Sequence, residues 1–294
     1  MKREWIRGVG WLFTVELLLI WALGSYPVWL APAGVADAGL LRIVSVVGLV
    51  AWCGCWLAMR QPAGALVDWQ GTLQFVACWI NFPLFKAIRR YWIATPADDA
   101  LLGMDRVLWG GASLPEHFFR CEHVAVSEAL SFAYFCFYFV ILLPVIWFSI
   151  RRRDAEAKRY FFGLSYLYLV GFAGYLLVPA GGPYMAFPEL FPYPVHGGPM
   201  TAFLTARVAE GITGMDVFPS LHSGITLFVT GFFLTARQRS GYRPAAALLV
   251  PIFVGVVLAT VYLRYHYGID LVAGLLLGWS AIRLVDGLRR KEQP

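Results

Sequence analysis

Long apolar segments constrain this chain most strongly, because a helix needs about 20 mostly apolar residues to cross the hydrocarbon core of a bilayer. Eight segments approach or exceed that length: residues 8–30, 38–59, 65–85, 124–149, 160–179, 217–236, 244–263 and 267–286. Only 14 % of the 294 residues are charged, and 59 % are hydrophobic. Soluble domains carry about 25 % charged residues. We therefore expect an all-α polytopic membrane protein with about eight transmembrane helices. The segment 65–85 is the weakest, since polar residues interrupt it.

The basic residues predict the orientation of the chain. They gather in four stretches: "MKREWIR" at the start, "RRRDAEAKR" at 151–159, "RQRSGYR" at 237–243 and "RRKEQP" at the end. With eight spans and a cytoplasmic first residue, all four stretches face the cytoplasm, where Lys and Arg concentrate in membrane proteins. We expect a bacterial inner-membrane protein with both termini cytoplasmic and the opposite face periplasmic. A lumenal face in a eukaryotic secretory-pathway membrane would obey the same rule.

This orientation places residues 86–123, 180–216 and 263–267 on the outer face. Residues 86–123 mix charged side chains with Trp and Tyr, which is typical of a segment lying in the membrane interface. Residues 180–216 contain "AGGPYMAFPELFPYPVHGGP", whose Gly and Pro content favours an ordered loop over another helix.

Two short motifs at the outer face carry titratable side chains. "DVFPSLHSG" (216–224) opens the sixth segment, and "YLRYHYGID" (262–270) opens the eighth. Pro219 suits the first turn of a helix and Ser220 its cap, so His222 projects from a helix N-terminus, where free N–H groups favour an anion.

The second motif completes a candidate catalytic set. His266 and Asp270 are four residues apart and share one face of a helix. Asp270 can hold one imidazole nitrogen and leave the other free as a nucleophile. Arg264 adds a planar cation suited to phosphate oxygens. These groups suit phosphoryl transfer without a metal or another cofactor, because no third ligand is spaced to complete a metal site with His222 and His266.

Together, "PSLHS" and "HYGID" resemble the type 2 phosphatidic acid phosphatase superfamily, whose members share one site on a six-helix membrane core. The wording "FPSLHSG…YLRYHYGIDLVAG" is closest to the inositol phosphorylceramide synthase branch, the aureobasidin target in fungi. "GYLLVPAGGPY" (174–184) is also similar to that branch. The resemblance covers about residues 100–286. It implies two N-terminal transmembrane helices in residues 1–63 and a six-helix catalytic core in residues 64–294.

The resemblance also implies roles for individual residues. His266 is the nucleophile that forms a phosphohistidine, Asp270 orients it, and His222 acts as acid and later as base. Two family features are missing: "LLVPAGGPY" stands in place of the K-x6-R-P signature, and Ala259-Thr260 replaces the usual S-R. These departures favour the transferase-like branch over a generic lipid phosphate phosphatase.

The residues that bind the substrate phosphate are less defined by sequence. Candidates are Arg264, which lies one helical turn after Thr260, and Ser220 at the helix cap. Backbone N–H groups of Gly181 and Gly182, with the neighbouring Tyr184, are further candidates, although this turn can equally be an ordinary loop. Other outer-face cations are Lys86, Arg89 and Arg90.

Other titratable residues have simpler interpretations. Glu128 is expected to pair with an outer-face arginine or to touch substrate, and Glu16 to pair with another helix. The loop histidines are expected to be structural; they are His117, His123 and His196. The five cysteines show neither a disulfide framework nor metal-ligand spacing.

The sequence therefore predicts a membrane enzyme that acts on a lipid phosphoester, with no nucleic-acid partner. The acceptor is either water, which makes it a phosphatase, or an alcohol such as inositol or a sugar, which makes it a transferase. Two alternatives come from other classes. One is a proton-coupled transporter that uses His266 and Asp270 as a relay. The other is a protein that binds a lipid phosphate without turning it over. The sequence does not indicate the oligomeric state.

Overall fold

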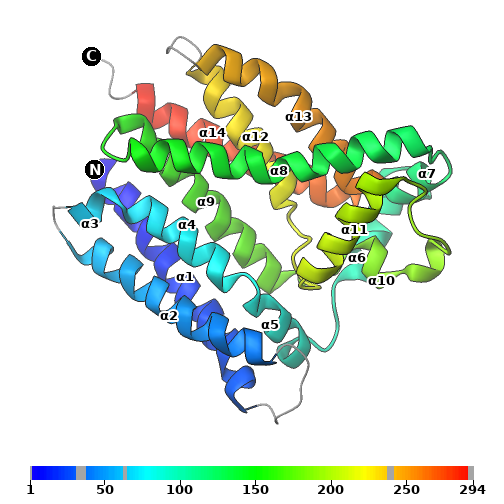
Figure 1. The fold of residues 1–294 in the computed structure, drawn as a ribbon, viewed down its shortest axis with the longest axis horizontal. Helices are drawn as coiled ribbons and strands as arrows, with labels where there is room; N and C mark the ends of the chain where they lie inside the picture. The colour runs from blue at the N-terminus through cyan, green and yellow to red at the C-terminus, as the bar shows by residue number, and fades with distance from the viewer. Residues whose placement is uncertain (1, 31–37, 62–64, 237–241, 291–294) are drawn as a thin grey trace. The chain divides into compact units, whose positions relative to one another are not determined.

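A computed structural model describes residues 2–30, 38–61, 65–236 and 242–290, and every regular element in these ranges is helical (Figure 1). The all-α prediction is confirmed. Six helices are long and apolar enough to cross a membrane, as expected of a polytopic membrane protein. They are α1 (Lys2–Leu30), α2 (Ala38–Arg60), α8 (Val124–Ile150), α9 (Ala155–Leu177), α13 (Tyr242–Tyr262) and α14 (Gly268–Arg290).

The single span predicted over residues 65–85 is wrong. The structure contains three shorter helices there: α3 (Ala65–Asp68), α4 (Gln70–Asn81) and α5 (Leu84–Trp92). Pro83 lies at the junction of α4 and α5, and proline has no N–H with which to continue a helix. The polar Gln74 of this segment is buried and donates to the carbonyl of Gly10 over 2.8 Å.

The span predicted over residues 217–236 is also shorter than expected. α12 (Leu221–Thr235) has 15 residues, which rise about 22 Å, against roughly 30 Å of hydrocarbon. The described ranges therefore hold six full-length spans rather than eight. The loop predicted over residues 180–216 needs a correction too, since it includes the 13-residue helix α11 (Pro199–Gly211).

The chain divides into two compact units. The first comprises residues 1–95, 145–173 and 284–294, and the second comprises residues 96–144 and 174–283. Consequently α8, α9 and α14 each contribute to both. The functional division predicted between residues 63 and 64 stays a prediction.

In the first unit, α2 packs against α1 and α4, and α1 also packs against α5. Aromatic rings fill much of its interior, as in the stacked pair Phe13 and Tyr168, whose centroids are 6.3 Å apart. Glu16 lies on α1, and its buried Oε2 has no hydrogen-bond partner among the residues described. The interhelical pair predicted for this carboxyl oxygen is therefore not found.

In the second unit, α12 packs against α13, and α13 also packs against α7 (Leu114–Phe119). Three further short helices belong to this unit: α6 (Asp98–Leu108), α10 (Pro183–Ala186) and the 3-10 helix η1 (Pro188–Leu190). Glu128 on α8 accepts the N–H groups of Gly198, Met200 and Thr201 over 2.8–3.1 Å. This carboxylate caps α11. The predicted pairing with an outer-face arginine is not found among the residues described.

Glycine residues bring α12 and α14 together in the second unit. A Cβ on Gly274 would lie 2.2 Å from the carbonyl oxygen of Ser220, and one on Gly278 would lie 2.4 Å from that of Gly224. Small residues spaced four apart let two membrane helices approach backbone to backbone. The contact joins the beginning of α12 to the first half of α14, which are the two elements that carry the predicted catalytic residues.

Replacing Gly274 by Ala is expected to force these two helices apart. Overpacking of a well-packed interior costs about 1–3 kcal/mol. We expect Gly274→Ala to unfold at a lower temperature than the wild type in detergent, as followed by Trp fluorescence. Gly287→Ala is the matched control on the same helix, because its Cβ meets no atom within 4 Å. Equal unfolding temperatures for the two variants would contradict the close helix contact.

Candidate active site

The first motif forms the beginning of α12. Ser220 is the N-cap, and its Oγ accepts the N–H of Ser223 over 3.3 Å, which confirms the predicted cap. The helix begins at Leu221, so Pro219 precedes the cap and does not occupy the first turn, where the sequence placed it. Ser220 is completely buried, and its own N–H donates to the carbonyl of Asp270 over 3.1 Å. Both motifs are therefore joined through their backbones, and the predicted contact of the Ser220 hydroxyl with phosphate stays a prediction.

The second motif forms a tight turn between α13 and α14. The N–H groups of Tyr265 and His266 both donate to the carbonyl of Thr260 over 3.0 Å. Arg264 has a φ of 69°, an uncommon conformation for a residue other than glycine. This left-handed residue ends α13 and turns the chain so that His266 precedes the first turn of α14.

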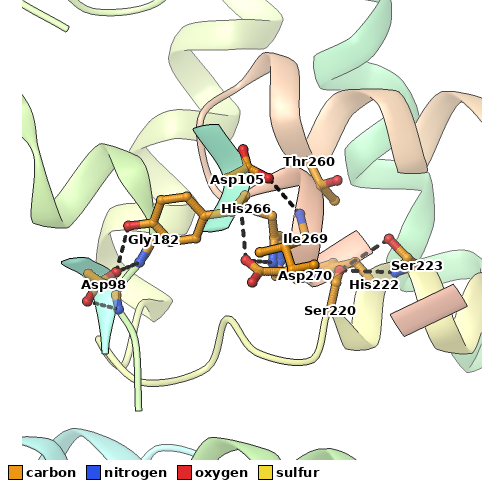
Figure 2. Close-up of polar contacts among 12 residues, drawn as sticks. Asp98, Asp105, Gly182, Ser220, His222, Ser223, Thr260, His266, Ile269 and Asp270 are labelled. Atoms are coloured by element: carbon orange, nitrogen blue, oxygen red, sulfur yellow. Dashed lines mark hydrogen bonds and ion pairs between the residues drawn. The ribbon is translucent and has the colours of Figure 1, made fainter. Parts of the chain in front are cut away.

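The two predicted histidines lie next to each other inside the second unit (Figure 2). Nδ1 of His222 lies 3.2 Å from Nε2 of His266. The opposite nitrogen of His266, Nδ1, lies 3.6 Å from Oδ2 of Asp270. This separation is longer than a hydrogen bond, although the carboxylate lies on the side of the ring where the sequence placed it. The structure therefore brings the three predicted catalytic side chains together.

Burial determines the protonation of the candidate nucleophile. His266 is 2 % exposed. Loss of hydration lowers its pKa to about 4, although the charge of Asp216 and a backbone hydrogen bond at Val217 act in the opposite direction. The imidazole is therefore neutral at neutral pH and keeps the lone pair that a nucleophile needs.

Sequence reasoning missed a third group on the histidine pair. The hydroxyl of Tyr134, on α8, lies 3.0 Å from Nε2 of His222. The ring of Phe137, one helical turn further along, packs on the same imidazole with centroids 4.3 Å apart. The sequence does not single out Tyr134, because α8 also carries the hydroxyls of Ser131 and Tyr138.

Two buried carboxylates of α6, also missed, hold the motifs in place. Asp98 accepts the N–H groups of Gly181 and Gly182 over 3.0 and 2.9 Å, and the hydroxyl of Tyr267 over 2.9 Å (Figure 2). Asp105 accepts the N–H of Ile269 over 2.7 Å at the start of α14. Two acidic residues seven apart in an interfacial segment lie on the same face of a helix, and this spacing was the available signal.

The N–H groups of the Gly181–Gly182 turn both donate to Asp98 in this structure. Binding of a phosphate by this turn stays a prediction. Gly182 has a φ of 83°, and a Cβ there would lie 2.3 Å from the carbonyl oxygen of Tyr265. Only glycine allows this close approach. The N–H of Tyr184 donates to the carbonyl of Arg264 over 2.9 Å, which fastens the turn to the second motif.

The guanidinium of Arg264 is also engaged by protein groups. It forms a buried ion pair with Glu122 and donates to the carbonyl of Tyr193 over 2.7 Å. The rings of Phe119 and Phe191 lie 4.8 and 5.0 Å from its central carbon. Each terminal nitrogen has one such contact, whereas the buried Nε has no hydrogen-bond partner among the residues described. The predicted contact of Arg264 with phosphate stays a prediction.

The remaining predicted residues fall into two groups. Three histidines were predicted to be structural, and that role stays a prediction. The His117 ring, on α7 rather than in a loop, contacts the carbonyl of Trp109, His123 contacts Ala125 and Tyr262, and the backbone N–H of His196 donates to Glu122. The cations on α5 belong to the first unit and stay predictions; they are Lys86, Arg89 and Arg90.

Comparisons with known proteins show the family of the chain. A model of the PAP2 superfamily matches residues 99–284, which include both motifs and all of α6 except its first residue, Asp98. The phosphoinositol dihydroceramide synthase of Bacteroides thetaiotaomicron is 29 % identical over 233 residues, which make up 70 % of this chain and 74 % of that protein. No solved structure matches the chain.

Replacing Asp98 by Asn is expected to loosen the Gly181–Gly182 turn. The variant loses the negative charge that accepts three hydrogen bonds, and hydrogen bonds to charged groups contribute about 2 kcal/mol each. We expect Asp98→Asn to unfold at a clearly lower temperature than the wild type. Asp99→Asn, at an exposed position of the same helix, is the control and should match the wild type. Identical melting of Asp98→Asn and Asp99→Asn would mean that the carboxylate does not support the turn.

Proposed function

The chain belongs to the PAP2 superfamily, and from this premise we propose that it transfers the phosphorylated head group of a membrane lipid through a phosphohistidine on His266. The observation that carries this proposal is the facing pair of His222 and His266, with Asp270 behind the second ring. The chain is an integral membrane protein, and its family and its similarity to a lipid synthase make it a lipid phosphatase or phosphotransferase.

The first step forms a bond between phosphorus and Nε2 of His266. As that bond forms, the bond from phosphorus to the lipid oxygen breaks, and the leaving oxygen takes the proton on Nδ1 of His222. Asp270 balances the positive charge that develops on the phosphorylated ring. Positioned acids of this kind contribute roughly 10²- to 10⁴-fold to a rate.

The second step reverses these roles. The acceptor hydroxyl gives its proton to Nδ1 of His222 and attacks phosphorus, and the bond to Nε2 of His266 breaks. Both histidines are then restored. Apart from the lipid and the acceptor, the groups that these two steps use are side chains of this protein. In the described ranges, no three His, Cys, Asp or Glu side chains gather as metal ligands would.

We propose an alcohol, rather than water, as the acceptor. The name of the Bacteroides relative states a synthase of phosphoinositol dihydroceramide, which supports transfer of an inositol phosphate group to the hydroxyl of a ceramide-type lipid. Arg264 belongs to the second motif, and its contacts with Glu122 and Tyr193 attach the segment after α10 to that motif. Exclusion of water protects a reactive intermediate from hydrolysis.

We further propose that the site faces the periplasm of a bacterial inner membrane. α14 is 23 residues long, about 34 Å, so it can cross the hydrocarbon core. Its first turn carries Asp270, and its last turn carries Arg289 and Arg290. Arg289 pairs with Glu156 in the basic stretch 151–159 over 3.0 Å. By the positive-inside rule, this basic end is cytoplasmic and the site lies at the opposite face.

Replacing His266 by Ala is expected to abolish turnover. Purified protein in nanodiscs would receive a panel of lipid phosphoesters, with and without ceramide-type lipids, inositol and sugar alcohols. Free phosphate and new phospholipid would both be measured. We expect a lipid product that depends on an acceptor and is lost in His266→Ala. His117→Ala, on α7 and outside the histidine pair, should retain the activity.

Other outcomes of this panel select the alternatives. Phosphate release without an acceptor, by the wild type alone, would make the protein a phosphatase. Equal behaviour of the wild type and His266→Ala would contradict a catalytic His266 and favour a proton-coupled transporter or a protein that only binds a lipid phosphate.

The pH dependence of kcat/KM provides a separate prediction. Protonation removes the lone pair of His266, so activity falls as the pH drops through the pKa of this residue. Because burial lowers that pKa from 6.5 to about 4, we expect the acid limb near pH 4. An acid limb at pH 6.5 or above in the profile of kcat/KM would contradict a buried, neutral nucleophile.

A further inference from the structure

The hydroxyl of Tyr134 contacts the histidine pair and has no part in the two steps above. Tyr134 is 4 % exposed, and its hydroxyl lies 3.0 Å from Nε2 of His222. Its ring lies against the same imidazole, with centroids 4.9 Å apart. Tyr134 belongs to neither motif and precedes His222 by 88 residues.

Four groups follow one another as successive neighbours: the carboxylate of Asp270, the rings of His266 and His222, and the phenol of Tyr134. The negative charge of a carboxylate 3.6 Å from Nδ1 of His266 favours a proton on that nitrogen and leaves Nε2 with its lone pair. That lone pair needs a donor, which is N–H at Nδ1 of His222. Nε2 of His222 then carries a lone pair, and the phenol is its donor.

We propose that Tyr134 is a positioning residue for His222: its hydroxyl donates to Nε2 and keeps the proton on Nδ1, the nitrogen that faces the nucleophile. This proposal rests on the proposed function. A neutral imidazole with its proton on Nε2 would present a lone pair to Nε2 of His266, and it could not protonate the leaving oxygen.

The phenol also balances the proton transfers. When Nδ1 of His222 gives its proton to the leaving oxygen, Nε2 takes the phenol proton, so the imidazole stays neutral and Tyr134 becomes a phenolate. In the second step, the acceptor hydroxyl protonates Nδ1, and the proton on Nε2 returns to the phenolate. No proton is gained or lost over the cycle, and the site needs none from water while the intermediate exists.

Packing around His222 does not depend on this hydroxyl. Phe137 covers the imidazole from the same helix, so a phenyl ring at position 134 preserves the packing and removes only the hydrogen bond. The titratable groups that face Tyr134 and the two histidines come from three helices and two loops; they are Tyr138, Tyr175, Asp216, Tyr265 and Asp270.

The test compares Tyr134→Phe with Tyr262→Phe in the nanodisc assay, with His266→Ala alongside. Tyr262 is the matched control, because its hydroxyl is buried and bonded to Ser127 and the N–H of His123, away from the pair. We expect kcat of Tyr134→Phe to fall about 10- to 100-fold, a share of the contribution of general acid–base catalysis, with KM and the unfolding temperature unchanged.

A pH profile separates this role from a structural one. Without the phenol, His222 has to take its second proton from solvent, so the deficit of Tyr134→Phe should shrink as the pH is lowered toward 5. A deficit that is constant with pH and accompanied by earlier unfolding would overturn the proposal. Full activity of Tyr134→Phe would overturn it too. If His266→Ala remained active, the proposed function itself would fail.

A measurement on the wild type reports the position of the proton on His222 directly. Nitrogen-15 NMR of histidine-labelled protein distinguishes the two neutral tautomers of each ring. We expect the proton of His222 on Nδ1, assigned by comparison with His222→Gln. A proton on Nε2 of His222 would overturn the proposal.

Discussion

The close crossing of α12 and α14 is the constraint on which the site depends. Gly274 lies against the carbonyl of Ser220, and the N–H of Ser220 donates to the carbonyl of Asp270. Side chains of any size at this crossing would separate the two backbones. Because the helices meet at their N-terminal ends, His222 in the first turn of one helix comes within 3.2 Å of His266 just before the other. The approach of the two histidines is thus a consequence of backbone packing.

Carboxylates and tyrosine hydroxyls make the hydrogen bonds around this histidine pair. Asp98 and Asp105 of α6 hold the turn at Gly182 and the start of α14. In a poorly hydrated site such charge-assisted hydrogen bonds are stronger than in water, so they fix the backbone firmly. An amphipathic helix expected at the membrane interface therefore carries the supports of the site on its buried face.

Sequence patterns predicted those contacts of the site that join residues close together in the chain. The cap at Ser220 follows from helix geometry alone, and the structure has it. The helix predicted to carry both His266 and Asp270 begins only at Gly268, yet the His266 ring in the preceding turn still lies 3.6 Å from Asp270. Contacts between distant segments were not predictable. The ion pair of Arg264 joins it to Glu122, 142 residues earlier, and the contact of Tyr134 spans 88 residues. Hydropathy likewise predicted six of the eight spans at full length, since a window average does not register the break at Pro83 or a short α12.

The central claim is a covalent phosphohistidine on His266, and mass spectrometry of the trapped protein tests it most directly. Wild-type protein would be mixed with a lipid phosphoester donor in the absence of an acceptor, quenched in alkali, digested and analysed peptide by peptide. We predict a mass increase equal to the transferred phosphorylated group on the peptide that contains His266, and its loss when an acceptor lipid is added before the quench. Product formation without any modification of His266, or with the modification on another residue, would contradict the account.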